Sequence, residues 1–230
     1  MLNINSDRIL NYTVDSGLAS NQIKNSREYY VLALLKHLFP DQFSLLHKSE
    51  SPDLQDSEGF LGVEVTSGIR RRDELISGEG AKFFRAKTID EKESSLQKIM
   101  NVGGNIERFV ISTPATTIEP DWEQVIEVFQ KKLEKIDSYK ESLKHVGLAI
   151  IIDYPTFPFN DYNWSASLSE LNQQKYDFVI FSHWSGIDIY DFYADKFYSK
   201  SISCEERELL KKLGRMTAEG IIAEEDSEWQ

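Results

Sequence analysis

Residues 51–67, which read SPDLQDSEGFLGVEVTS, are the stretch from which the fold is inferred. A Pro-Asp pair ending in Asp53 opens the stretch, and a polar loop containing glycine follows it. An apolar run then carries Glu64 between two valines. A carboxylate in such a run is costly to bury without a partner, so its position needs a physical reason. Binding of a metal ion is one such reason.

The two halves of this stretch are predicted to pair as a hairpin, because a short polar loop with glycine separates two apolar runs. Successive side chains of a strand point to opposite faces, so Glu64 and Thr66 share one face. Pairing of residues 51–54 with residues 60–66 would place Asp53 beside Glu64. Two neighbouring carboxylates repel unless a cation lies between them, and oxygen ligands favour Mg²⁺ or Mn²⁺. Such an ion can polarise a phosphodiester and activate a water molecule.

The rest of the chain alternates between helical and strand-like segments, which predicts an α/β fold with a central mixed sheet flanked by helices. A helix is expected from Asn25 to Pro40, where Asn25 and Glu28 have the capping-box spacing. Residues 68–104 contain arginines, glycines and a polar helical run, and we interpret them as an insertion. The other expected elements are strands at 43–46, 107–113, 146–152, 176–182 and 186–190, and helices at 89–100, 120–143, 165–173 and 205–213.

Size and composition indicate one intracellular domain covering residues 1–230. The chain has a net charge of -12 and one cysteine, Cys204, which excludes an internal disulfide. No apolar run approaches the roughly 20 residues that cross a bilayer, and the polar N-terminus does not resemble a signal peptide. We therefore expect a cytoplasmic protein without a membrane partner. Acidic residues gather at 214–230, which we expect to form a disordered or solvated tail.

The letters P-D at positions 52–53 and E-V-T at positions 64–66 resemble the motif of the PD-(D/E)xK nuclease superfamily. This resemblance implies a restriction-endonuclease-like fold, whose core runs helix, hairpin, strand, helix, strand. On that reading the core spans residues 25–190, and residues 68–104 are an insertion after the motif strand. The order of the elements supports the resemblance more than the short motif does.

The resemblance also implies roles for particular residues. Asp53 and Glu64 would be metal ligands, Val65 would add a backbone carbonyl, and Mg²⁺ or Mn²⁺ would be the cofactor. Glu28 would be the acid that some members of the superfamily supply from the first helix. The alternative for Glu28 is a capping-box glutamate paired with Asn25.

Thr66 departs from the family pattern, which has a lysine there to position the water and to stabilise developing charge. On the helix expected at 120–143, Lys132, Lys135 and Tyr139 share one face at i, i+3 and i+7. Lys135 and Tyr139 also match the Gln-xxx-Tyr spacing of the exonuclease-like branch, with lysine in place of glutamine. We predict Lys132 first and Lys135 second as the replacement cation. The alternative is a solvated helix face, because charges of both signs alternate along it.

An arginine run at 70–72 follows the motif strand directly. It could contact a phosphate backbone, because a local excess of positive charge attracts phosphate even on an acidic chain. The alternative is an exposed loop whose counter-ions are the acids at positions 73 and 74.

Two hypotheses for function remain. The first is a metal-dependent nuclease that hydrolyses phosphodiester bonds in nucleic acid, with DNA preferred, and the family association extends to phage defence and mobile elements. The second is an inactive nuclease-fold module that binds nucleic acid, a protein partner or another copy of the chain. Thr66 and the net charge of -12 favour the second hypothesis, whereas the retention of both Asp53 and Glu64 favours the first.

Overall fold

The computed structural model describes residues 2–13, 18–69, 71–107, 110–112, 122–152, 164–173 and 175–230. Within these ranges, a mixed sheet of seven strands lies at the centre, in the order β1-β2-β3-β6-β7-β8-β9. The strands are β1 (His47–Lys48), β2 (Leu54–Gln55), β3 (Leu61–Ser67), β6 (His145–Ile151), β7 (Phe178–His183), β8 (Gly186–Asp191) and β9 (Lys196–Ser201). Strands β3, β6 and β7 are parallel, and the other neighbours pair antiparallel. The predicted mixed α/β sheet is confirmed.

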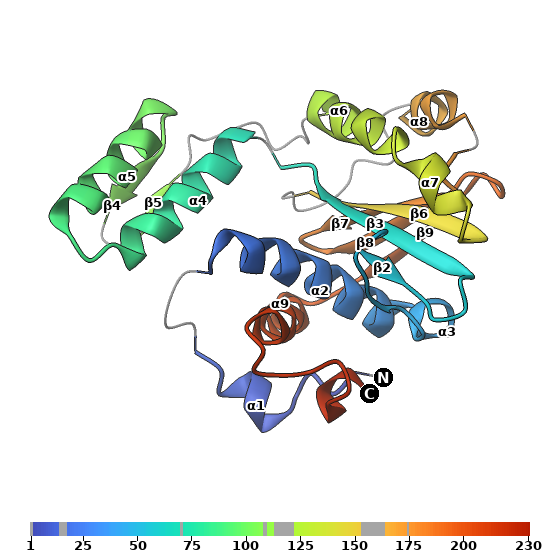
Figure 1. Ribbon diagram of the computed structural model, residues 1–230, viewed down its shortest axis with the longest axis horizontal. Coiled ribbons are helices and arrows are strands. Elements are labelled where there is room, and N and C mark those ends of the chain that lie inside the picture. The colour runs from blue at the N-terminus through green and yellow to red at the C-terminus, as the bar shows by residue number, and fades with distance from the viewer. Residues whose placement is uncertain are drawn as a thin grey trace.

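Helices cover both faces of this sheet and give the molecule three layers (Figure 1). One layer holds α2 (Ser20–Leu38) and α9 (Cys204–Ala218), which pack against each other. The short helices α1 (Asp7–Leu10) and α3 (Pro40–Phe43) contribute to the same core. The other layer holds α6 (Trp122–Leu133), α7 (Ile136–Lys140) and α8 (Trp164–Asn172). None of the helices in the described ranges is long and apolar enough to span a membrane.

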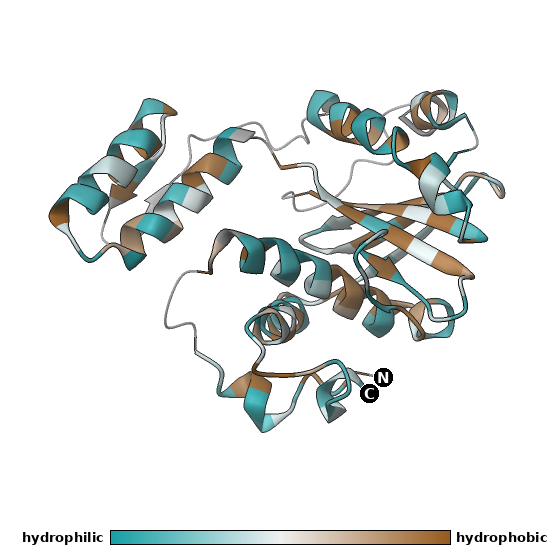
Figure 2. Cartoon of the chain, viewed as in Figure 1, coloured by the Kyte–Doolittle hydropathy of each residue, from teal (hydrophilic) through white to brown (hydrophobic). Residues whose placement is uncertain are grey.

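The alternation of side chains along the strands explains why both faces are covered. On β3, Val63 and Val65 enter the core that α2 and α9 share, so Glu64 between them faces the layer of α6 and α7. On β6, Leu148 and Ile150 enter the core of that second layer. A parallel strand buried on both faces is apolar along most of its length, as the brown colour of the central strands in Figure 2 shows.

The predicted hairpin forms, with Leu54 opposite Val63. Its turn contains Gly59 at a φ of +70°, a conformation that suits glycine. The buried carboxylate of Asp56 closes the turn by accepting two backbone N–H groups from the start of the next strand. The ladder between β2 and β3 is short, so Asp53 lies just beyond its last pair.

Residues between β3 and α6 form an arm that stands beside the three layers (Figure 1). The arm consists of α4 (Arg71–Arg85), α5 (Ile89–Asn101) and a two-stranded sheet of β4 (Asn105–Glu107) and β5 (Val110–Ser112). The predicted insertion at 68–104 corresponds to its two helices, of which α5 was expected. The strand expected at 107–113 is confirmed in part: β5 lies within it, whereas Glu107 belongs to β4, which pairs antiparallel with β5 so that Ile106 lies opposite Ile111.

Several element boundaries differ from those expected. Helix α2 begins at Ser20 rather than at Asn25. The strand expected at 43–46 is absent among the described elements, because Pro40 starts the new helix α3 instead. The helix expected at 120–143 is divided into α6 and α7. Strand β9 was not predicted, because all its residues are exposed and no buried alternation marks it.

The acidic tail is packed, contrary to the expectation of disorder. Its last turn is a 3-10 helix, Ser227–Trp229, in which the buried indole N–H of Trp229 donates to Thr217 Oγ1 at 3.1 Å. Glu228 is also buried and pairs with Arg8 of the N-terminal segment at 3.4 Å. Burial of Trp229 and the pairing of Asp226 and Glu228 with Arg8 offset the mutual repulsion of the acidic residues in this segment. The two ends of the chain therefore lie close together (Figure 1).

The close contact between α2 and α9 depends on Gly214. A Cβ atom at this position would lie 2.7 Å from the backbone nitrogen of Tyr30 and 3.0 Å from the carbonyl oxygen of Ser26. These are backbone atoms of α2, which cannot rotate away as a side chain can. Any larger residue at this position would therefore push the two helices apart.

We predict that Gly214→Ala lowers the free energy of unfolding by about 1–3 kcal/mol, as overpacking does, although alanine has the better helix propensity. Gly78→Ala is the matched control, because it also replaces a helical glycine but its Cβ would meet no atom within 4 Å. The control should gain about 0.5–1 kcal/mol. Thermal unfolding followed by circular dichroism measures both, and equal stabilities for the two variants would contradict the prediction.

Candidate active site

Three buried acids gather around β3 from three different elements. Glu64 lies on β3 itself, Asp53 precedes β2, and Glu28 lies on α2. Their residues are 4%, 5% and 1% exposed, respectively. Acids at this depth destabilise the fold unless cations or hydrogen-bond donors compensate them. Each of the three has such partners, and these partners define the candidate site.

The carboxylate of Asp53 is held against the backbone of β3. Its Oδ2 accepts a hydrogen bond from the backbone N–H of Val65 at 2.8 Å. Its Oδ1 lies 3.4 Å from the ammonium nitrogen of Lys24 on α2. The backbone pairing of β2 with β3 ends at Leu54 and Val63. Beyond this pair, the carboxylate of Asp53 takes the place of a backbone carbonyl as the acceptor for β3. The hairpin thereby brings Asp53 next to Glu64 along the chain of β3, as the sequence predicted.

The carboxylate of Glu64 is held by two side chains of the opposite layer. Its Oε1 lies 2.5 Å from Nζ of Lys132, at the end of α6. Its Oε2 accepts a hydrogen bond from the hydroxyl of Tyr139, on α7, at 2.9 Å. Burial, and then the charge of Glu64, raise the pKa of Tyr139 to about 12, so this phenol keeps its proton at neutral pH.

Glu28 is part of the same cluster and is not a helix cap. The first turn of α2 is closed by Gln22, whose side chain accepts from the backbone N–H of Ala19. Glu28 lies further along the helix, where its two oxygens are 3.1 Å from Lys24 and 2.8 Å from Lys48. Burial raises its pKa, and the neighbouring ammonium groups of Lys48 and Lys24 oppose that shift. The contact with Glu28 in turn raises the pKa of Lys24.

The structure separates the two lysines that the sequence proposed. Lys132 reaches Glu64, whereas Lys135 is exposed at the start of α7. The expectation that these lysines and Tyr139 share one face of a continuous helix is wrong, because the chain bends between α6 and α7. That bend lets Lys132 and Tyr139 approach Glu64 from two helices. Tyr176, which is fully buried, supports the end of α6 by donating its hydroxyl hydrogen bond to the carbonyl of Lys132 at 2.9 Å.

A cavity of about 250 Å³ opens beside these acids, and we refer to it as the site cavity. It lies at the carboxyl ends of β3 and β6, facing α2 and the end of α6. It is lined by Ile23, Lys24, Arg27, Glu28, Val65, Thr66, Ser67, Lys132 and Ile151. Its lining holds more cations than acids, although the whole chain is acidic. The lining could therefore attract an anion such as a phosphate group.

Lys24 and Lys48 belong to the cluster but were not predicted from the sequence. Lys24 lies four residues before Glu28 on α2, and this i, i+4 spacing was the available signal for it. Lys48 had no such signal, because only the tertiary fold brings β1 against α2. The predicted basic run at 70–72 stays largely undefined: Arg70 and the side chain of Arg71 lie outside the described residues. Arg72 lies on α4, so the exposed-loop alternative is wrong; of the two counter-ions it named, Asp73 pairs with Arg72 at 3.4 Å, whereas Glu74 pairs with Arg27.

A divalent metal ion at this site would need several oxygen ligands close together. Among the described residues, no three histidine, cysteine, aspartate or glutamate side chains lie together as a metal-binding group. Two buried carboxylates, Asp53 and Glu64, and the backbone of Val65 are the oxygen donors at the site. Mg²⁺ is commonly held by one or two carboxylates, with water and substrate phosphate as the other ligands. Two carboxylates and one carbonyl are as many protein ligands as Mg²⁺ commonly takes, and in this structure each carboxylate oxygen has a protein partner: the N–H of Val65, Lys24, Lys132 or Tyr139.

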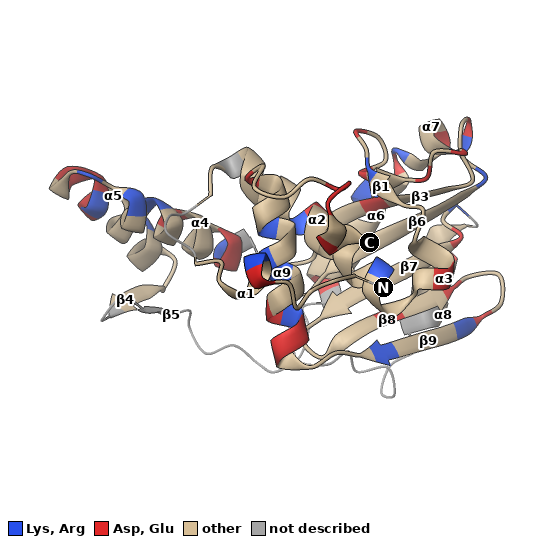
Figure 3. Ribbon diagram, turned by 90° about the horizontal axis from the view of Figure 1, so that it is seen from below, with Lys and Arg blue, Asp and Glu red and all other residues tan. Residues whose placement is uncertain are grey.

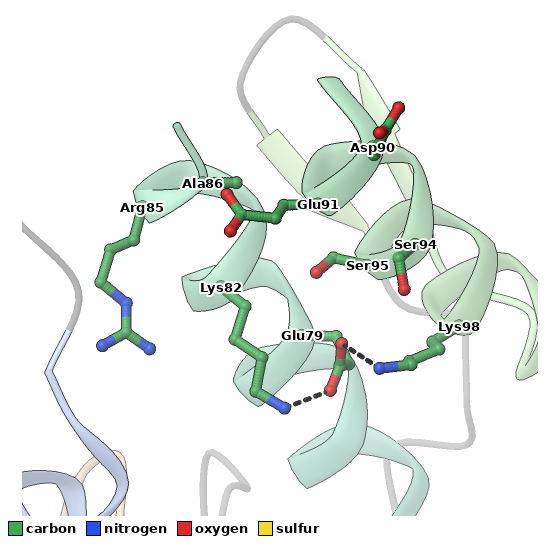
Figure 4. Close-up of a pocket in the computed structure, with 9 residues that line it drawn as sticks. All are labelled: Glu79, Lys82, Arg85, Ala86, Asp90, Glu91, Ser94, Ser95 and Lys98. Atoms are coloured by element: carbon green, nitrogen blue, oxygen red, sulfur yellow. Dashed lines mark hydrogen bonds and ion pairs between the residues drawn. The ribbon is translucent and has the colours of Figure 1, made fainter. Parts of the chain in front are cut away.

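A larger hollow of about 610 Å³ lies on the arm, between α4 and α5 (Figure 4). Glu79 bridges the two helices there, with its carboxylate 2.6 Å from Lys82 and 3.4 Å from Lys98. The cations and acids of this lining are equal in number, and Figure 3 shows both charges interspersed along α5. A balanced, open surface of this kind selects no particular charge, so we do not assign it a ligand.

Comparisons of the chain with protein-family models, with curated proteins and with solved structures find no match. The geometry of the site is therefore the basis for assigning a function.

We predict that replacing Tyr139 with phenylalanine changes how stability depends on pH. The pKa of this phenol is about 12 in the folded protein and about 10 when unfolded, so the folded state holds more protons between these values. Its contribution is present below pH 10 and is lost as pH rises toward 12. Tyr139→Phe should be less stable by about 1–3 kcal/mol at neutral pH, because Glu64 loses a hydrogen bond, and should lose less stability above pH 10.

Urea unfolding of both proteins between pH 7 and pH 11.5 measures this difference. Tyr198→Phe is the control, because the hydroxyl of Tyr198 belongs to an exposed residue on β9. If the free energy of unfolding changes with pH in the same way for the wild type and Tyr139→Phe, the Tyr139–Glu64 hydrogen bond does not cause the loss of stability above pH 10.

Proposed function

We propose that this chain is a metal-dependent nuclease of the restriction-endonuclease-like fold, which hydrolyses phosphodiester bonds in nucleic acid, with DNA preferred. The observation that carries the proposal is that Asp53 and Lys132 both reach the middle of β3, where Asp53 accepts from the backbone N–H of Val65 and Lys132 pairs with Glu64. Two acids and one lysine are the side chains that the PD-(D/E)xK motif requires. Here the lysine comes from a helix and not from the motif strand.

The order of elements supports the same fold. Helix α2 carries Glu28 and precedes the hairpin of β2 and β3, after which α6 leads into β6 beside β3. This order is that of the restriction-endonuclease-like core, with the arm inserted after the motif strand. Asp53 and Glu64 take the motif positions within that core.

We assign the following roles to the site residues. Asp53, Glu64 and the carbonyl of Val65 would hold Mg²⁺ or Mn²⁺, which, when bound, polarises the phosphate and lowers the pKa of an attacking water. Lys132 replaces the motif lysine: its ammonium lies against Glu64 and lines the site cavity, where it can stabilise negative charge on a phosphate oxygen. Tyr139 orients Glu64 through the other carboxylate oxygen.

The remaining cations of the site cavity would position the substrate. Lys24 and Arg27 line the cavity with Lys132 and can contact phosphate oxygens, because phosphate contacts fix the register of a nucleic acid without reading its sequence. Arg27 is also paired with Glu74 of the arm at 2.9 Å. This pair connects the site to the arm, which we propose contributes to holding the nucleic acid.

A second candidate function is an inactive module that binds nucleic acid or a protein partner. One observation favours it: each acid of the cluster already has an internal cation, Lys132 for Glu64 and Lys24 for Asp53 and Glu28. Compensated acids do not require a metal ion for the fold to be stable. Thr66 in place of the motif lysine points in the same direction.

We predict that Mn²⁺ raises the melting temperature of the protein. A ligand at a hundred times its Kd stabilises the folded state by about 2.7 kcal/mol, and this would shift the transition by several degrees. Asp53→Asn should abolish the shift, whereas Asp90→Asn, which changes an exposed aspartate on the arm, should not. Differential scanning fluorimetry with and without EDTA provides the measurement. A shift that persists in Asp53→Asn would place the metal elsewhere.

We predict that the protein cleaves DNA in the presence of Mn²⁺ or Mg²⁺ and that Glu64→Gln and Lys132→Gln each reduce the rate by about 100-fold or more. Glutamine keeps a hydrogen-bonding group at both positions, and circular dichroism checks that each variant is folded before its rate is compared. Lys135→Gln is the matched control, because this lysine is exposed and close in sequence. Gel assays with single- and double-stranded DNA and RNA give the rates.

The same two measurements separate the two candidate functions. Metal stabilisation with cleavage that depends on Glu64 and Lys132 supports the nuclease. Absence of both cleavage and metal stabilisation rules out the nuclease and leaves the binding module. Equal loss of rate in Lys132→Gln and Lys135→Gln would show that helix charge in general, and not Lys132 in the site, is responsible.

A further inference from the structure

A second hollow lies at the end of the sheet opposite to the candidate active site. Its volume is about 470 Å³. It includes Leu61 and His145, which pair with each other at the beginning of β3 and β6, whereas the site cavity includes Ser67 and Ile151, which pair at their ends. The length of the two strands therefore separates the hollow from the site cavity. The proposed nuclease chemistry does not involve it.

Aromatic side chains dominate the lining, and we call this site the aromatic hollow. The rings are Phe39, Phe43, Phe60, Phe178, Tyr193 and Tyr198. Phe43 and Phe178 form its buried part, with ring centroids 6.1 Å apart. Phe60, Tyr193 and Tyr198 form its rim and are 48%, 67% and 43% exposed. Three large aromatic residues kept in water around one concavity are characteristic of a binding surface.

The charge of the aromatic hollow is negative. The carboxylates of Asp41, Asp177 and Asp191 line it, and the described lining contains no lysine or arginine. His145 lies 3.6 Å from Asp177 Oδ1, and the backbone N–H of Val146 donates to Oδ2 of the same acid at 2.6 Å. Asp191 Oδ1 accepts backbone N–H groups of Tyr193 and Ala194.

Two features indicate that positive charge is favourable at this surface. The chain's own lysines rest on rings at its edge: Lys144 Nζ lies 4.9 Å from the ring centroid of Phe60, and Lys200 Nζ lies 4.5 Å from that of Phe39. The negative field also affects Tyr193, whose pKa is raised chiefly by the charge of Asp177. A cation over these rings would gain from both the ring faces and the carboxylates.

We propose that the aromatic hollow receives an arginine side chain from a basic segment of a partner protein. A guanidinium group is flat, so it can stack on the rings of Phe60 or Tyr193 while donating hydrogen bonds to carboxylates. The cavity volume accommodates such a side chain together with its neighbours. The partner is basic because this chain carries a net charge of -12, which attracts a positive surface and repels an acidic one.

The test uses a library of fluorescent nonapeptides with a central arginine, two flanking lysines and random neutral residues elsewhere. A matched library carries citrulline at the centre, which keeps the shape of arginine but removes its charge. Fluorescence anisotropy with the full-length protein measures binding at low and at physiological salt. The best arginine peptides should bind at least about five-fold more tightly than their citrulline forms, because a desolvated cation–π contact and a charged hydrogen bond are lost.

All the variants change exposed side chains, so they should fold as the wild type does. Asp41→Lys should weaken binding of the arginine peptides about five-fold or more, whereas Asp90→Lys should not. Both aspartates lie in the first turn of a helix, and both substitutions change the net charge equally. Tyr193→Ala should weaken binding as well, and Phe84→Ala, which removes a similarly exposed ring from the arm, should leave it unchanged.

Several results would overturn the proposal. Equal binding of arginine and citrulline peptides would show that charge is not recognised. Equal weakening by Asp41→Lys and Asp90→Lys would show a general charge effect and no specific site. Competition by free arginine at the affinity of the best peptide would make the hollow a small-molecule site and not a docking site for a protein. If no arginine peptide binds, the aromatic hollow is not a binding site for an arginine side chain.

Discussion

The compensation of buried acids around β3 is the constraint on which the rest of the site depends. Glu64 faces the layer of α6 and α7 because Val63 and Val65 occupy the opposite core. Its carboxylate must then be paired, and Lys132 and Tyr139 provide one partner for each oxygen. Removal of either partner would leave a charge or an acceptor uncompensated, which costs more than the pair contributes. The bend between α6 and α7 thus allows residues of both helices to contact Glu64, a single side chain of the central sheet.

The same principle connects the layer of α2 and α9 to the site. Glu28 on α2 and Asp53 before β2 share Lys24, and Asp53 also accepts a hydrogen bond from the backbone of β3, so polar contacts join these elements in addition to apolar packing. A network of this kind gives a binding site a defined geometry, because no member can move without exposing another. It also places cations beside a cavity in a chain that is acidic overall. Local charge, and not net charge, is therefore what a phosphate group would meet.

The two ends of the parallel strands differ in chemistry. At the carboxyl ends of β3 and β6, lysines and an arginine line the site cavity; at their beginnings, aromatic rings and carboxylates line the aromatic hollow. One end suits a polyanion and the other suits a cation. A basic partner docked at the hollow would leave the site cavity open. This arrangement would allow an acidic protein to approach nucleic acid with help from a basic neighbour.

The sequence by itself determined the mixed α/β class, the hairpin of β2 and β3, and the pairing of Asp53 with the Glu64 strand, because these follow from local turn chemistry and from the alternation of side chains. It also ranked Lys132 before Lys135, and Lys132 is the one of the two that pairs with Glu64. Only the tertiary structure decided that Lys48 joins the cluster, that Lys24 reaches Asp53 as well as Glu28, that Lys135 stays outside, and that the tail is packed through Trp229. Those outcomes depend on contacts between residues far apart in the chain, which no local pattern encodes. The physical reason is burial. A buried carboxylate needs a compensating cation, and the fold decides which cation lies near it, however far apart the two residues are in the sequence.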